Sequence, residues 1–117
     1  MAKQNIKAVI DGKTFELRGV EVSKALSEET TAFSADIYID GHRAGHVRNN
    51  GQGEGNFPVI LPEARASYDA IEAAVKRHHY HAVGQRGHVY DWDYDMDFLI
   101  GMMVEAAWYD NKGTYVL

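Results

Sequence analysis

The chain has 117 residues, a mass of 13.1 kDa and no cysteine, which is close to the size of one ordinary domain. Its hydrophobic fraction of 45% and charged fraction of 25% are typical of a folded protein rather than a disordered one. The lack of cysteine excludes disulfides, thiolate metal sites, Fe–S clusters and a cysteine nucleophile. We therefore expect a single domain over residues 1–117, and nothing in the composition calls for a cofactor.

The formal net charge is −5, with an isoelectric point near 5.6. An acidic chain repels phosphate backbones, which disfavours nucleic acid as a partner. No apolar run approaches the ~20 residues of a membrane span, and the first residues lack the apolar segment of a signal peptide. We expect a cytoplasmic protein with no membrane partner.

The first half of the sequence predicts antiparallel strands. Asp11-Gly12 and Asp40-Gly41 each lie between strand-like runs, and Asp-Gly suits a two-residue type I′ turn. Residues 33–40 alternate strictly between apolar and polar side chains, as in a half-buried strand. The apolar phase changes at Gly19, which predicts a β-bulge there. Residues 57–61 contain Pro58 and are at best an edge strand.

The second half predicts two helices. Pro62 suits a first helical position, and an apolar face at helical spacing runs from Ala64 to His78, so that this helix is expected to end near residues 82–84. A second helix is expected from about Asp95 to Tyr109. Residues 114–117 form either a short strand or a docked tail. The predicted fold is α+β: a twisted antiparallel sheet of about four to five strands in residues 1–61, with two helices from residues 62–117 on one face.

Residues 49–56 form a glycine-rich loop that is one candidate binding site. Its G-x-G-x-G pattern lacks the GK[ST] of a P-loop and does not lead directly into a helix. A plain loop is one interpretation, and a loop that grips a small ligand or nucleotide is the other. The residues that would bind such a ligand are Asn49, Asn50, Gly51, Gly53, Gly55 and Asn56.

The histidines near the end of the first predicted helix are a second candidate. His78 and His81 are three residues apart, a spacing that can bring two imidazoles to one metal ion, with His88 or Asp91 as a third ligand. Histidine is also favoured at helix C-termini by the helix dipole, so that a surface cluster is the alternative. The metal interpretation implies a metal-dependent hydrolase.

A third candidate is an acidic and aromatic segment. Aromatic and acidic residues alternate there, and Trp and Tyr are frequent anchors of protein interfaces. The alternative is a short strand whose aromatic side chains complete the core. Exposure of Trp92 distinguishes the two interpretations. The candidate partner-binding residues are Tyr90, Asp91, Trp92, Asp93, Tyr94 and Asp95.

The layout of residues 20–55 carries a family resemblance. The sequence Ser-Glu-Glu-Thr at 27–30, the alternating strand, Asp40-Gly41 and the Asn-Gly-Gln-Gly at 50–53 resemble small, mostly uncharacterised accessory proteins of phages and bacterial mobile elements. This resemblance implies a protein that acts in the host cytoplasm, in a class where inhibitors of host defence systems are common.

No serine lies in a nucleophile-elbow context, and no acid–base pair stands out, so we expect no enzymatic activity. The leading hypothesis is a small acidic protein that binds a host protein through residues 90–95 and inhibits a host defence system. A ligand-sequestering protein that uses residues 49–56 and a hydrolase that uses the histidines are the alternatives. A two-fold homodimer is a further expectation.

Overall fold

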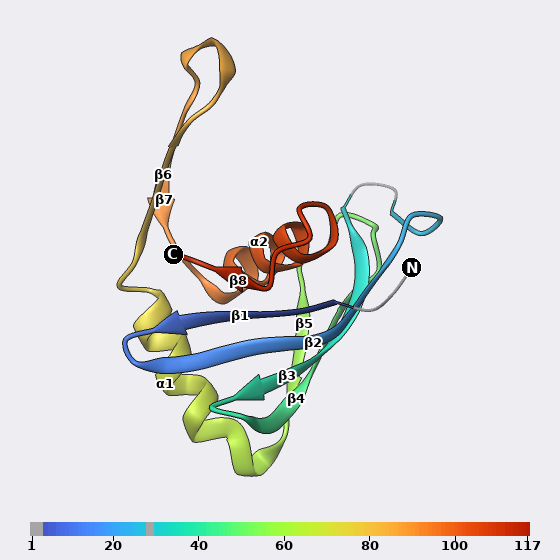
Figure 1. The fold of residues 1–117 in the computed structure, drawn as a ribbon, viewed down its shortest axis with the longest axis vertical. Helices are drawn as coiled ribbons and strands as arrows, with labels where there is room; N and C mark the ends of the chain where they lie inside the picture. Colours follow the sequence, from blue (N-terminus) through green and yellow to red (C-terminus); the bar gives the residue numbers. More distant parts are fainter. Residues whose placement is uncertain (1–3, 28–29) are drawn as a thin grey trace.

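The computed structural model describes residues 4–27 and 30–117. Glu28 and Glu29, which belong to the Ser-Glu-Glu-Thr part of the resemblance, lie outside the described residues. The elements follow one another as shown in Figure 1. In chain order they are β1 (Gln4–Ile10), β2 (Lys13–Ser23), β3 (Ala32–Ile39), β4 (His42–Asn49), β5 (Phe57–Ile60), a 3₁₀ turn (Pro62–Ala64), α1 (Arg65–Val75), β6 (His79–Val83), a second 3₁₀ turn (Gln85–Gly87), β7 (Val89–Asp93), α2 (Met96–Trp108) and β8 (Thr114–Tyr115).

The main sheet has six strands in the order β5-β4-β3-β2-β1-β8. The first five are antiparallel neighbours, whereas β8 pairs with β1 in parallel. The amide of Lys7 donates a hydrogen bond to the carbonyl of Gly113, 3.1 Å away, just before β8 begins. The α+β class is therefore confirmed, but the sheet is mixed and has more strands than predicted because the C-terminal segment adds one.

Both predicted Asp-Gly hairpins and the predicted bulge are confirmed. The φ angles of Asp11 and Gly12 are 51° and 82°, and those of Asp40 and Gly41 are 49° and 83°. These positive angles are what a type I′ turn requires. Gly19 has a φ of 64°, and the pairing of β2 with β3 shifts register beside it, so that the apolar side chains before and after it share one face.

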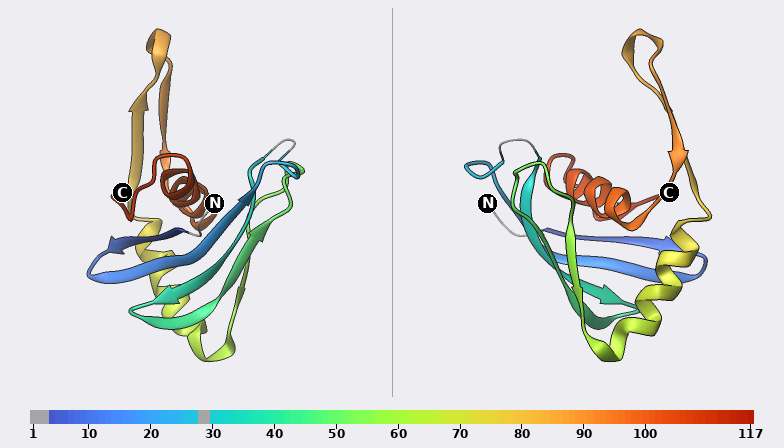
Figure 2. Two further views of the ribbon diagram at one scale, coloured as in Figure 1. Left: turned by 45° about the vertical axis from the view of Figure 1, so that its right-hand side comes forward. Right: turned by 180° about the vertical axis from the view of Figure 1, so that it is seen from behind.

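The core lies between the sheet and the two helices, which cover one face (Figure 2). Alternate residues of β1 and β2 are buried, and α1 and α2 contribute Tyr68, Ile71, Leu99 and Met103 to the same cluster. The ring of Phe15 on β2 lies 6.4 Å from that of Tyr68 on α1. α2 begins where predicted, with Asp95 as its N-cap: the Asp95 carboxylate accepts a hydrogen bond from the Phe98 amide at 2.7 Å.

The first helix is shorter than predicted. α1 ends at Val75, and the residues expected to continue it form β6, which pairs with β7 in a separate two-stranded sheet. These two strands and the turn between them project well beyond the rest of the molecule, as the views in Figures 1 and 2 agree. The prediction was wrong because the ring of Tyr80 packs on Trp92 and Phe98, which are 12 and 18 positions later in the chain. Local periodicity carries no information about such contacts.

Among the described ranges, the longest helix is α2 with 13 residues. None in those ranges has the length and hydropathy that a membrane span requires.

Candidate functional site

The projecting hairpin of residues 79–93, called the arm below, has two chemically different faces. Its register pairs His79 with Asp93, Tyr80 with Trp92 and Ala82 with Tyr90. Directly paired residues share a face of a sheet, and successive residues alternate between faces. One face therefore carries the aromatic side chains of Tyr80, Tyr90 and Trp92, and the other carries His79, His81, Asp91 and Asp93.

The aromatic face forms a continuous stack of rings that begins in the body of the protein. Phe98 on α2 lies 5.0 Å from Tyr80 and 5.3 Å from Trp92, measured between ring centroids. Tyr80 and Trp92 stack at 5.6 Å with planes 30° apart, and Tyr90 meets Trp92 edge-on at 5.7 Å. His88 extends the stack towards the tip, 4.6 Å from Tyr90. Such contacts add to the burial energy of each ring and give the arm a defined shape.

The outer part of this stack is open to solvent. Tyr90 is 39% and Trp92 is 40% exposed, and Val83 and Val89 on the opposite face are also exposed. The partner-binding hypothesis requires an exposed Trp92, and the indole is exposed. The aromatic side chains of the arm form an exposed apolar surface on an element that stands away from the core.

The acidic and aromatic segment predicted as a binding surface divides at the end of β7. Residues 90–93 lie on the arm and are exposed. Tyr94 is only 3% exposed, and its hydroxyl lies 2.7 Å from that of Tyr115, so that it belongs to the core instead of the predicted surface. Asp95 is exposed, but its carboxylate serves as the N-cap of α2. The exposed surface predicted for all six residues ends at Asp93, because Tyr94 packs into the protein against Tyr80 and Phe98.

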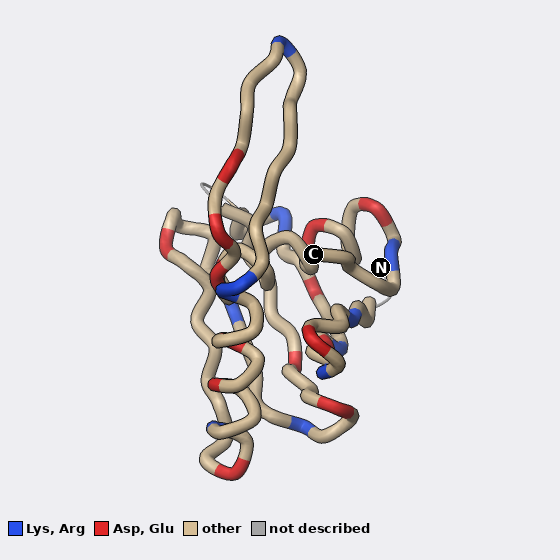
Figure 3. Tube along the Cα trace, turned by 90° about the vertical axis from the view of Figure 1, so that its left-hand side faces the viewer, with Lys and Arg blue, Asp and Glu red and all other residues tan. Residues whose placement is uncertain are grey.

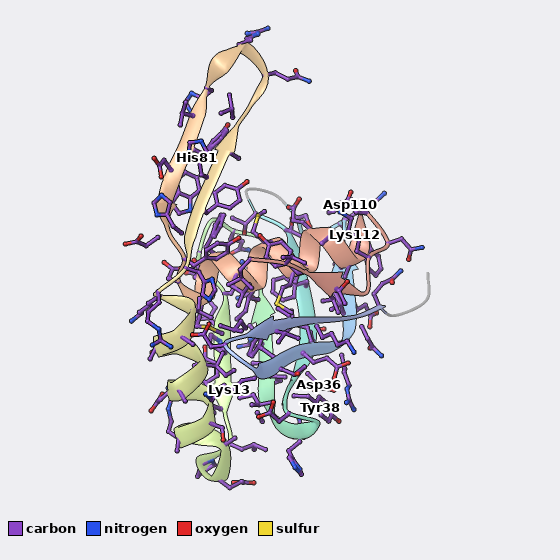
Figure 4. The ribbon with its side chains drawn as sticks, turned by 60° about the vertical axis from the view of Figure 1, so that its left-hand side comes forward. Lys13, Asp36, Tyr38, His81, Asp110 and Lys112 are labelled. Carbon is purple, nitrogen blue, oxygen red and sulfur yellow. The ribbon has the colours of Figure 1, made fainter. Side chains whose placement is uncertain are left out.

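On the polar face, His79 is held between two carboxylates. Its Nδ1 lies 3.0 Å from an oxygen of Asp93, its Nε2 contacts Asp91, and His81 Nδ1 lies 3.8 Å from the second oxygen of Asp91. Hydrogen bonds to Asp93 and Asp91 raise the pKa of His79, and the hydrogen bond from His79 lowers the pKa of Asp91. Figure 4 shows His81 on the arm, well away from the helices and the main sheet.

The predicted metal ligands are brought together only in part: His81 lies near Asp91, whereas His78 and His88 lie elsewhere. His78 lies just before β6, where its Nε2 is 3.2 Å from Asp11, a carboxylate that Arg77 also binds at 2.7 Å. His88 packs on Tyr90 near the tip of the arm. The helical spacing of His78 and His81 is absent because α1 has already ended, and the described part of the chain contains no group of three His, Asp or Glu side chains placed to hold a metal ion.

The glycine-rich loop is held by hydrogen bonds within the protein, and two of the asparagines predicted to bind a ligand, Asn49 and Asn56, take part in them. Asn49 is 8% exposed; its carbonyl oxygen accepts hydrogen bonds from the Thr30 hydroxyl and the Gly51 amide. The Asn49 amide group donates to the Glu54 carbonyl and to the Asn56 side chain. Asn50, Gly53 and Gly55 are exposed, whereas Gly51 is buried.

Asn56 joins this loop to α2. Its backbone amide donates to the Asp97 carboxylate at 2.7 Å, and its side-chain amide donates to the Asp97 carbonyl at 2.9 Å. The loop and successive turns of α2 line a cleft of about 560 Å³. Sequence reasoning identified the loop but not its contact with Asp97, which is 41 residues away from Asn56 in the chain.

Sequence reasoning also missed half of the arm. A signal for β6 is present, since Tyr80 and Ala82 alternate with His79, His81 and Val83 and five such residues before a Gly-Gln-Arg-Gly turn are typical of a hairpin strand. The helical periodicity that ends at His78 obscured it.

No protein-family model, curated protein or solved structure matches the chain. The function is therefore inferred from the arm and its surroundings.

Proposed function

We propose that this chain is a non-enzymatic binding protein that docks on another protein through the aromatic face of its arm. The observation that carries this proposal is the exposure of Tyr90 and Trp92 on an element that projects from the body (Figure 1). Tyr and Trp are enriched among the residues that dominate binding energy at protein interfaces. A projecting element can also enter a groove that a flat surface cannot reach.

The limited stability expected for the outer part of the arm supports the same proposal. A two-stranded hairpin without further packing is marginally stable in water. Among the described residues, the ring contacts between the arm and the body lie at the base of the arm, where Tyr80 packs on Phe98 and Tyr94, and Trp92 packs on Phe98. Cover by a partner would remove the rings of Tyr90 and Trp92 from water and stabilise the outer part of the arm.

The charges favour a basic partner. The carboxylates of Asp91 and Asp93 contact His79 on the polar face of the arm, and 52% and 81% of these two side chains remain exposed, while Arg86 is in the tip turn. Figure 3 shows this distribution, with blue at the tip and red along the strand nearer the base. With a net charge of −5, the chain attracts a partner that carries Lys or Arg beside an apolar groove, which would accelerate association.

A second copy of the chain would bring another five negative charges, so that a different protein is the better match for the arm. The resemblance to phage and mobile-element proteins makes a host protein in the bacterial cytoplasm, such as a component of a defence system, the natural candidate. Inhibition would then follow from occupation of a groove that the host protein needs.

Photo-crosslinking in bacterial cells tests the proposal. A benzophenone amino acid replaces Tyr90 on the arm or, as a matched control, Tyr109, which is 53% exposed and lies at the end of α2. We expect one cross-linked protein from position 90 and none of the same mass from position 109. An adduct with the mass of two copies of this chain, or equal adducts at both positions, would overturn the proposal.

Binding by the purified partner then gives the quantitative test. Trp92→Ser should weaken the affinity by roughly ten- to one-hundred-fold, as expected for a central aromatic anchor. Tyr109→Ser should leave the affinity unchanged. Affinity should also decrease as salt is added, since acidic side chains steer the complex; equal losses in both variants would contradict a docking role for the arm.

A further inference from the structure

The cleft between the glycine-rich loop and α2 is a separate feature from the exposed face of the arm. It is an open cleft of about 560 Å³, within the range of roughly 300–1,000 Å³ that small-ligand sites occupy. One wall comes from residues 49–56, and the other comes from successive turns of α2. The hydrogen bonds of Asn56 to Asp97 join the two walls.

The lining combines apolar and acidic groups. Phe98 and Met102 from α2 are partly exposed there and supply apolar surface, with the largely buried Phe33 and Val104 beside them. A small ligand with an apolar part would lose contact with water against these side chains, which favours its binding.

The charge of the lining has one sign. Glu54, Asp97 and Glu105 are among the lining residues, and the described residues that line the cleft include no Lys, Arg or His. Among the described residues, the carboxylates of Glu54 and Glu105 form no ion pair or side-chain hydrogen bond, whereas Asp97 accepts the amide of Asn56. A phosphate group would meet only negative charge here, which removes the electrostatic basis for the nucleotide-binding alternative.

We propose that this cleft binds a small organic cation, namely an amine or guanidinium group carried on a short apolar stem. The carboxylates of Glu54 and Glu105 at the rim would pair with the cationic group. The apolar stem would lie against Met102 and the ring of Phe98, and aromatic rings also attract cations through their faces. The site is distinct from the exposed surface of the arm and does not depend on the proposed function.

Methyl NMR of the full chain tests the site with defined probes. Agmatine and spermidine supply cationic groups on aliphatic stems, and AMP supplies a matched anionic probe. Met102 lines the cleft, while its neighbour Met103 is fully buried in the core, so that the two methyl groups provide a reporter and an internal control. We expect agmatine or spermidine to shift the Met102 methyl resonance in a saturable way, with little change at Met103 and no response to AMP. Shifts with AMP that equal those with the amines would overturn the proposal, as would the absence of any saturable shift.

Three variants separate a built site from general attraction of cations to an acidic protein. Glu105→Gln should weaken amine binding about five- to ten-fold. Gly101→Leu should abolish it by filling the cleft, since a Cβ at Gly101 meets only Asn56 at 3.8 Å and a leucine is favourable in a helix. Glu63→Gln removes the same charge from the exposed 3₁₀ turn before α1 and should leave affinity unchanged. Equal weakening by Glu63→Gln and Glu105→Gln, or undiminished binding in Gly101→Leu, would contradict the proposal.

Discussion

The ring of Phe98 meets the indole of Trp92 edge-on, with centroids 5.3 Å apart and ring planes at 82°. Phe98 belongs to α2 and Trp92 to the arm, so that this contact fixes the base of the hairpin on the helix. The same phenyl ring also lines the cleft between the glycine-rich loop and α2. One side chain therefore joins the two surfaces to which we assign binding roles.

Replacement of Phe98 should loosen the arm. Phe98→Ala removes contacts with Tyr80, Trp92 and Tyr94 and should lower the free energy of unfolding by about 2–3 kcal/mol, near the low end for a truncated phenylalanine because Phe98 is only partly buried. Hydrogen exchange of amides in residues 79–83 and 89–93 should accelerate more than exchange in β2 and β3.

Phe57→Ala is the matched control, because Phe57 is 45% exposed on the edge strand β5. Its effect on stability should stay below about 1 kcal/mol. If both variants lower the free energy of unfolding by the same amount, or if hydrogen exchange in the arm is unchanged in Phe98→Ala, then Phe98 does not anchor the arm.

Substitution of the adjacent residues Asn49 and Asn50 should change the free energy of unfolding by very different amounts. Asn49→Ala removes four hydrogen bonds made by a buried side chain and leaves the Gly51 amide and the Glu54 carbonyl without that partner. We expect a loss of about 2–4 kcal/mol in urea unfolding. Asn50→Ala, at an exposed position, should change stability by less than about 0.5 kcal/mol. Similar losses would refute the view that Asn49 organises the loop.

Gly45 allows β5 to pair closely with β4. Its φ angle is 155°, and a Cβ there would lie 2.0 Å from the backbone carbonyl oxygen of Val59. Gly45→Ala must therefore separate the strands and should lower the unfolding free energy by more than about 3 kcal/mol. At Gly113 a Cβ meets nothing within 4 Å, so that Gly113→Ala should be close to neutral. Thermal unfolding of both variants tests this prediction. A Gly45→Ala variant as stable as the parent chain would contradict the close approach of β5 to β4 at Gly45.

The polar face of the arm should be most stable in a mildly acidic window. The pKa of His79 is raised, so that its stabilising contribution is complete below the ordinary value of about 6.5 and is lost as pH rises through the raised value. The pKa of Asp91 is lowered, so that its contribution is present above about 3.9 and is lost as pH falls through the lowered value. Protection of arm amides should therefore peak between about pH 4 and 6.5.

An NMR titration of the His79 imidazole tests whether Asp93 and Asp91 raise its pKa. In a variant with both Asp91→Asn and Asp93→Asn, the pKa of His79 should fall towards its ordinary value, because the two hydrogen-bonded carboxylates are removed. Asp110→Asn, at an exposed position outside the arm, should leave the titration of His79 as in the parent chain. An unchanged midpoint in the double variant would show that these carboxylates do not act on His79.

Elements that depend on neighbouring residues were predictable from the sequence. The Asp-Gly turns need only two residues with positive φ, and the N-cap at Asp95 bonds an amide three positions later. The bulge at Gly19 was visible because the apolar phase changes there. Local patterns record these features because the interacting groups are close together in the chain.

The arm was not predictable in the same way. β6 exists because Tyr80 packs on Trp92 and Phe98, and β8 exists because Thr114 and Tyr115 reach β1 at the opposite end of the chain. Alternation correctly placed Tyr90 and Trp92 on one exposed face, but the exposure predicted for Tyr94 was wrong, because its hydroxyl meets that of Tyr115 in the core. The cleft depends on the contact of Asn56 with Asp97, which also joins distant parts of the sequence.

Hydrogen–deuterium exchange of the chain, free and in complex with the partner captured at position 90, tests the central claim most directly. If the arm is the docking element, amides of residues 79–83 and 89–93 should exchange at least ten-fold more slowly in the complex, while those of β2 and β3 stay unchanged. Unchanged exchange in the arm, together with new protection on the sheet or in the glycine-rich loop, would contradict the account.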